Sequence, residues 1–134
     1  MKIITKSLSA TLLLSSLFYF SQQKTNALAN TEWKGVANIP TPAEVTFKFN
    51  TDQADLVYQG NVIEKMSYSF TDQGSLKLVK LEGNSPCDSK EEGLYKYQIV
   101  NDTLTFMIIN DKCMERQTAF DGNGYKKVTA AAIR

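Results

Sequence analysis

Residues 87–116 read CDSKEEGLYKYQIVNDTLTFMIINDKCMER and predict a single β-hairpin that turns at Asn101-Asp102. A two-residue loop fixes the register of a tight hairpin. Counting outward from this loop pairs Val100 with Thr103, Ile99 with Leu104, Tyr97 with Phe106 and Tyr95 with Ile108. The last three pairs are apolar and share one face, because side chains alternate along a strand; the other face is mostly polar. The stretch therefore predicts an antiparallel hairpin with one face in a core.

Two cysteines lie just outside the open end of this hairpin. The predicted ladder ends near Glu92 and Asp111, and Cys87 and Cys113 lie beyond it, 26 residues apart. We expect them to form one disulfide, since the first part of the chain resembles an export signal and exported proteins meet an oxidising environment. Two free thiols are the alternative.

Residues 1–29 have the composition of a signal peptide. Two lysines stand near the start, an apolar run spans 8–20, and Ala27-Leu28-Ala29 is an A-x-A cleavage site. We expect cleavage after Ala29 and a periplasmic or extracellular mature protein. A membrane anchor is the alternative, but the apolar run is shorter than the roughly 18 residues that a span needs. The mature form is therefore expected to have no membrane span.

The remaining residues, 30–134, suit one domain of ordinary size. The whole chain carries 15 basic and 14 acidic side chains, and loss of Lys2, Lys6 and Lys24 with the leader leaves 12 basic side chains against 14 acidic ones. A slightly acidic surface without basic runs is a poor partner for nucleic acid. We expect a monomer.

The other strands are predicted from alternating apolar residues between turn residues. Thr31–Asn38 is a candidate first strand, and IPTP at 39–42 interrupts it. The later segments predicted as strands are 44–50, the stretch that holds Leu56 and Tyr58, 62–70, the stretch that holds Leu76 and Leu78 and ends at Glu82, 114–120 and 125–128. A turn at Asp52-Gln53 pairs Phe49 with Leu56 and Phe47 with Tyr58; a three-residue loop ending at Gly74 pairs Phe70 with Leu76 and Tyr68 with Leu78. The register across Gly60-Asn61 stays open between two loop lengths.

This order of short strands predicts an all-β fold: an antiparallel up-and-down meander that closes into a small eight-stranded barrel. Closure removes the two exposed sheet edges. A sandwich is the alternative, but it usually needs longer crossover connections. A barrel of this size is filled by its own side chains or holds one small ligand.

One inward-facing stripe is rich in phenylalanine, tyrosine and methionine. The side chains that we expect to line a ligand cavity are Phe47, Phe49, Tyr58, Met66, Tyr68, Phe70, Leu78, Tyr95, Tyr97, Phe106 and Ile108. The equally weighted alternative is that the same stripe is a solid core.

Several motifs carry a family resemblance over nearly the whole mature chain. They are Trp33-Lys34-Gly35, IPTP at 39–42, VTFKF at 45–49, NSPCD at 84–88, GLYKY at 93–97, DTLTF at 102–106 and DKCMER at 111–116. Together they resemble the small bacterial lipocalin-like proteins of the calycin group. The resemblance implies a lipocalin-like barrel over residues 30–134. It also implies that Trp33 on the first strand packs against Arg116 to close one end of the barrel, as a structural cation–π pair.

Enzyme chemistry has little support in the sequence. The chain has no histidine, which removes the usual general base and the commonest metal ligand. Acidic residues such as Glu91 and Glu92 lie in a predicted loop, and no metal site or cofactor is expected. The sequence thus favours a non-catalytic exported barrel that binds a small apolar or amphipathic ligand. The alternative is a solid-cored interaction or inhibitor-type barrel, suggested by the outward-facing Val79, Leu81 and Met107.

Overall fold

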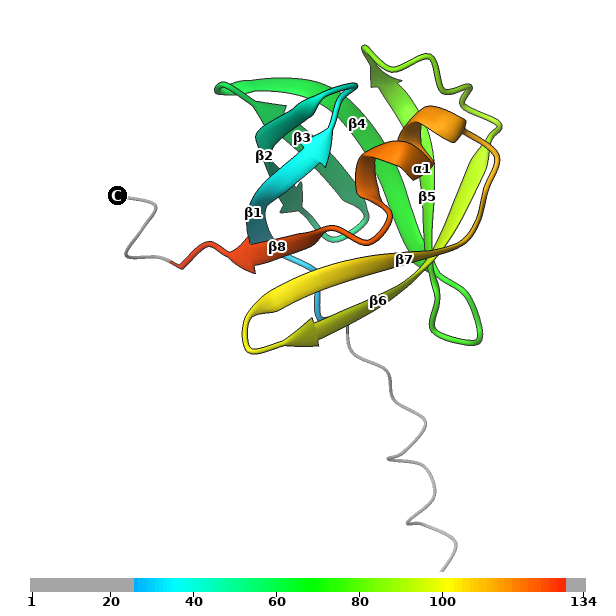
Figure 1. Cartoon of the computed structure of the whole chain (residues 1–134). Helices are drawn as coiled ribbons and strands as arrows, with labels where there is room; N and C mark the ends of the chain where they lie inside the picture. Colours follow the sequence, from blue (N-terminus) through cyan, green and yellow to red (C-terminus); the bar gives the residue numbers. More distant parts are fainter. Residues whose placement is uncertain (1–25, 130–134) are drawn as a thin grey trace, which may run out of the picture.

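The computed structural model describes residues 26–129, which form a closed barrel of eight antiparallel strands (Figure 1). Each strand pairs with the next, and β8 closes the barrel against β1. The elements are β1 (Thr31–Asn38), β2 (Pro42–Phe49), β3 (Gln53–Tyr58), β4 (Asn61–Phe70), β5 (Leu76–Gly83), β6 (Glu92–Val100), β7 (Thr103–Asp111), α1 (Met114–Phe120) and β8 (Gly124–Lys127). The predicted all-β meander and its closure into an eight-stranded barrel are confirmed. Residues 1–25 of the predicted leader, 1–29, lie outside the described residues.

The hairpin of β6 and β7 has the predicted register. Val100 pairs with Thr103, Tyr97 with Phe106 and Tyr95 with Ile108. Its two turn residues have φ values of 52° and 58°, the left-handed conformation that a tight hairpin turn of this type needs. An irregularity between Leu94 and Tyr95 shifts the register only beyond these pairs.

The β4–β5 hairpin also confirms its predicted pairs, Phe70 with Leu76 and Tyr68 with Leu78. Gly74 has a φ of 83°, as expected for the last residue of this loop.

The predicted register between β2 and β3 is wrong by two residues. Phe47 pairs with Leu56 and Phe49 with Ala54. The turn lies earlier than predicted, because Asn50 N–H donates to the carbonyl of Gln53 at 2.7 Å and β3 begins at Gln53. A shift of two residues keeps each side chain on its face, so the inward stripe survives the error.

Met114–Phe120 was predicted as a strand but forms the helix α1. Its buried residues are Arg116, Ala119 and Phe120. A spacing of three and four places these side chains on one face of a helix, whereas a strand would place Arg116 and Ala119 on opposite faces. The helical period was present in the sequence and was missed because the segment is so short.

The barrel has two different ends (Figure 1). We call the α1 end the one formed by α1, the β1–β2 loop, the β3–β4 turn and the β5–β6 loop. The N-terminal end is formed by residues 26–30 and the β2–β3, β4–β5 and β6–β7 turns. In the part of the chain that the structure describes, no helix is long and apolar enough to cross a membrane.

Residues 26–29 pack into the N-terminal end of the barrel. Leu28 is fully buried in the core. The side chain of Asn26 donates to the hydroxyl of Tyr68 at 3.1 Å and accepts from the backbone N–H groups of Leu28 and Ala29. Cleavage after Ala29, the predicted site, would remove the side chain of Leu28 from the core.

Replacing Leu28 with alanine is expected to lower the free energy of unfolding by about 2–3 kcal/mol, because it leaves a cavity in the closed end. Ala27, its exposed neighbour, provides the control: Ala27→Ser should change stability by less than about 0.5 kcal/mol. Denaturant unfolding of both variants in a chain that begins at Asn26 measures the difference. Equal stabilities would contradict the packing of this segment.

Candidate functional site

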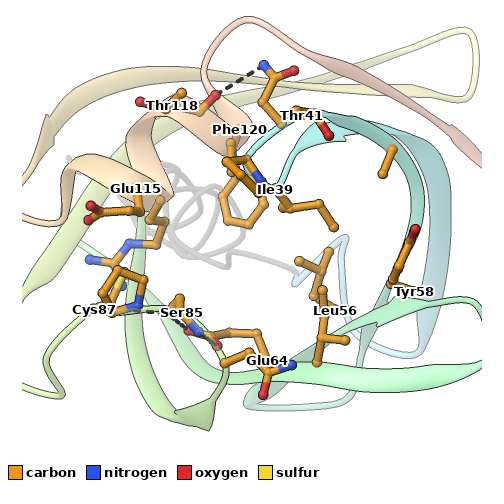
Figure 2. Close-up of a pocket in the computed structure, with 18 of the residues that line it drawn as sticks. Ile39, Thr41, Leu56, Tyr58, Glu64, Ser85, Cys87, Glu115, Thr118 and Phe120 are labelled. Atoms are coloured by element: carbon orange, nitrogen blue, oxygen red, sulfur yellow. Dashed lines mark hydrogen bonds between the residues drawn. The ribbon is translucent and has the colours of Figure 1, made fainter.

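A cavity of about 650 Å³ opens at the α1 end of the barrel (Figure 2). Its walls come from the β1–β2 loop, β2, β3, β4, the β5–β6 loop and α1. The residues that line it are Asn38, Ile39, Pro40, Thr41, Pro42, Ala43, Leu56, Tyr58, Ile63, Glu64, Met66, Asn84, Ser85, Pro86, Cys87, Met114, Glu115, Arg116, Thr118, Ala119 and Phe120. This volume falls within the roughly 300–1,000 Å³ of ordinary ligand sites.

The cavity has an apolar wall and a polar wall (Figure 2). Ile39, Leu56 and Phe120 lie on the apolar wall, which Tyr58 extends toward the β3–β4 turn. Glu64, the cross-strand neighbour of Leu56, and Ser85 lie opposite Ile39 and Phe120, on the side of β4 and the β5–β6 loop, while Glu115 at the start of α1 directs its carboxylate away from the cavity. The arrangement suits a molecule with one apolar part and one polar part.

The β1–β2 loop forms the rim beside α1. Its Ile39–Pro40 peptide bond is cis, and Ile39 N–H donates to the carbonyl of Thr41 at 2.9 Å. The side chain of Asn38 donates to the carbonyl of Thr118 at 3.3 Å, which ties the rim to the helix. The IPTP motif thus shapes one side of the opening.

The predicted disulfide between Cys87 and Cys113 is confirmed and joins two other parts of the same rim. Cys87 belongs to the β5–β6 loop, and Cys113 is the N-cap residue of α1. A bridge that closes a loop of this length contributes about 3.5 kcal/mol in the chain-entropy picture. The bridge therefore holds the helix against the loop across the mouth of the cavity.

A buried ion pair fixes the start of α1 from inside. Asp111 accepts from Nε and Nη2 of Arg116, each at 2.8 Å, and from the backbone N–H of Cys113 at 2.8 Å. The hydroxyl of Tyr95 also donates to Asp111. Burial, with this hydrogen bond to a carboxylate, raises the pKa of Tyr95 far above its ordinary value, so Tyr95 stays a donor.

A glycine makes room for this ion pair. A Cβ on Gly93 would lie 2.5 Å from Oδ2 of Asp111 and 2.9 Å from Nε of Arg116. The first residue of the GLYKY motif and the DKCMER motif are therefore parts of one framework, whose task is to position the helix.

Trp33 and Arg116 have other partners than the contact with each other that the resemblance implied: Lys127 lies over the ring of Trp33, and Arg116 pairs with Asp111. Trp33 is buried, its Nε1 donates to Thr31, and the ammonium of Lys127 lies 5.9 Å from the ring centroid. Trp33 and Lys127 are paired residues of β1 and β8. Because 114–120 is a helix and not a strand, Arg116 lies against Asp111 at the α1 end. Both residues are structural, in different places.

Of the residues predicted to line a ligand cavity, the structure places Tyr58 and Met66 on its wall. The others fill the barrel interior. Those buried in the packed core are Phe47, Phe49, Tyr68, Leu78, Tyr95 and Phe106, and those half-buried against it are Phe70, Tyr97 and Ile108. The ring of Phe47 lies 4.9 Å from that of Phe120 and 5.5 Å from that of Phe106. One part of the interior is therefore solid and the other is open.

The sequence interpretation missed Glu64 on the wall of the cavity. Glu64 has 7% of its surface exposed. Alternation along β4 places it on the same face as Met66 and Tyr68, so the strand pattern contained the signal. The apolar wall residues Ile39 and Phe120 were missed because they belong to a loop and to the helix that was predicted as a strand.

Within residues 26–129, no group of three or more cysteine or acidic side chains is placed to hold a metal ion. The polar wall offers carboxylates, hydroxyls and amides. These groups can orient a bound molecule by hydrogen bonds and charge.

Comparison with protein-family models, with curated protein sequences and with solved structures finds no match for this chain.

Proposed function

We propose that the protein is an exported lipocalin-like barrel that binds a small apolar or amphipathic molecule in the cavity at its α1 end. The observation that carries the proposal is the cavity itself: about 650 Å³, largely apolar, with a few polar groups gathered on one wall. The rim is held by the disulfide and by the buried pair of Asp111 and Arg116. A preformed site loses less entropy on binding, which supports affinity for a small ligand.

Displacement of an apolar fluorescent probe, N-phenylnaphthylamine, tests this proposal. We expect saturable binding by the wild-type protein and competition by long-chain alcohols. Ala43 lies on the wall, so Ala43→Trp should fill the cavity and weaken probe binding by about tenfold or more. Val36→Trp, an exposed site on the neighbouring strand, is the matched control and should bind the probe like wild type.

Unchanged probe binding in Ala43→Trp would show that the probe lies elsewhere. Absence of any binding would contradict the proposal.

The alternative function, an interaction module that uses its outer face, is favoured by one observation. Met107 and Ile109 are two residues apart on β7, both point outward, and their exposed fractions are 51% and 46%. The same probe assay separates the two functions. If the probe binds in the cavity, Met107→Lys should leave its affinity unchanged. If the probe binds to the outer apolar patch, Met107→Lys should abolish its binding.

A further inference from the structure

Glu64 is an acid in an apolar position. It faces the barrel interior between β3 and β5, its neighbours on the same face are Met66 and Tyr68, and 7% of its surface is exposed. Burial of an ionised carboxylate is costly unless hydrogen bonds or an opposite charge compensate for it. Such a side chain on the wall of a cavity indicates a polar group in the ligand.

No cation in the described part of the chain pairs with Glu64. Nζ of Lys65 lies 3.8 Å from Oε1 of Glu82, and the ammonium of Lys80 donates to the carbonyl of Ser85, the residue that also donates to Glu64. Arg116 also lines the cavity, but its charge is engaged by Asp111. Glu115 also lines the cavity, but its carboxylate points away from it. Glu64 is therefore a buried carboxylate on the cavity wall without an ion-pair partner among the described residues.

The hydrogen bonds of Glu64 leave room for a ligand. Ser85 donates to it twice, from its backbone N–H at 3.1 Å and from its hydroxyl. A carboxylate can accept about four hydrogen bonds, so two positions remain. The hydroxyl proton of Ser85 is committed to Glu64, while Cys87 N–H donates to the same hydroxyl oxygen. Ser85 therefore has no further side-chain proton to donate, and the free positions on Glu64 can accept from a ligand.

We propose, resting on the function above, that the cavity selects amphipathic amines: the ligand's ammonium group binds Glu64, and its apolar chain lies against Ile39, Leu56 and Phe120. An ammonium supplies both the missing charge and the N–H donors. A fatty carboxylate would place a second negative charge beside Glu64, and like charges that are close together repel. A neutral alcohol would supply a donor without the charge.

One group on the wall would favour an anion instead. Nη1 of Arg116 has no hydrogen-bond partner within the described residues, and Arg116 lines the cavity. Since Nε and Nη2 hold Asp111, Nη1 lies on the opposite edge of the planar guanidinium. Asp111 already forms an ion pair with this arginine, however, whereas no cation of the described residues lies within ion-pair distance of Glu64. We therefore expect Glu64, and not Arg116, to decide which ligand headgroup the cavity prefers.

The test is calorimetric titration of the wild-type protein with decylamine, decanol and decanoate, the two ionic ligands below their micelle concentrations and decanol below its solubility. Decylamine should bind about tenfold more tightly than decanol, in keeping with one charge-assisted hydrogen bond, and decanoate should bind most weakly. Glu64→Gln should weaken decylamine binding by about tenfold and leave decanol binding unchanged. Glu44→Gln removes an exposed charge on β2 and is the matched control, with wild-type affinities expected.

The outcomes separate this inference from the proposed function. If decanol and decylamine bind equally, or decanoate binds most tightly, the amine inference is overturned while the cavity still binds an amphiphile. If none of the three binds, the proposed function itself fails. Because Glu64 also holds Ser85, the unfolding midpoint of Glu64→Gln is measured alongside, and the ligand order in the wild-type protein decides the question even if this variant unfolds.

Discussion

Replacing Asp111 with alanine is expected to lower the free energy of unfolding by about 3–5 kcal/mol. The side chain of Asp111 is fully buried and that of Arg116 is 3% exposed. Without the carboxylate, the guanidinium remains buried with no opposite charge, and Tyr95 O–H and Cys113 N–H lose their acceptor. Removal of one partner of a buried pair costs more than the pair contributes. Denaturant unfolding monitored by circular dichroism measures the change.

Two comparisons make this prediction specific. The exposed pair of Lys34 and Glu44, 3.5 Å apart, is the control, and Glu44→Ala should cost less than about 1 kcal/mol. The double variant Asp111→Leu/Arg116→Met should lose less stability than Asp111→Ala, since no charge is left unpaired. A loss of under about 1 kcal/mol for Asp111→Ala would mean that this pair does not hold α1 in place.

The second large effect is expected at the centre of the packed part of the barrel. Phe47→Ala should cost about 3–5 kcal/mol, because it removes a fully buried ring. That ring lies 4.9 Å from the ring of Phe120, 5.1 Å from that of Tyr125 and 5.5 Å from that of Phe106. Close packing around it leaves little freedom to fill the space. Thermal and denaturant unfolding of the variant provide the value.

Met107→Ala is the control for Phe47→Ala, since Met107 is half exposed on the outer face of β7. It should change stability by less than about 0.5 kcal/mol. If Phe47→Ala cost as little, the interior around Phe47 would be as open as the α1 end. The division of the barrel into a solid part and a cavity would then be wrong.

The register of two hairpins could be predicted because local residues determine it. Asn101-Asp102 and the loop ending at Gly74 each have a length and turn chemistry that allow one pairing, and the apolar pairs agree with it. The β2–β3 turn lacks such a signal. Its hydrogen bond from Asn50 to Gln53 selects a turn that the sequence did not distinguish from its neighbours.

The site could be predicted less well, because loops and one short helix build it. Inward-facing residues follow from alternation along strands, but alternation does not tell a filled interior from an open one. Phe106 and Met66 both face inward, yet Phe106 is in the packed core and Met66 also lines the cavity. The difference depends on where α1 and the β1–β2 loop lie, and these are tertiary features.

The helix also explains why the Trp33–Arg116 expectation was wrong. That pairing was carried over from the family resemblance and required Arg116 to lie near β1. Instead, the guanidinium of Arg116 donates to the carboxylate of Asp111, which lies five residues earlier in the chain, just before α1. The spacing of these two residues in DKCMER was visible in the sequence, but its meaning depends on the segment being helical.

The central claim is that a ligand enters the open part of the barrel at the α1 end. Methyl-resolved NMR during titration with decanol tests it most directly. The account predicts saturable shifts at the methyl groups of Ile39, Leu56 and Ile63 on the cavity wall, while those of Leu104 in the packed core and Ile109 on the outer face stay unchanged. Shifts that concentrate at Ile109, or spectra that do not change at all, would contradict it.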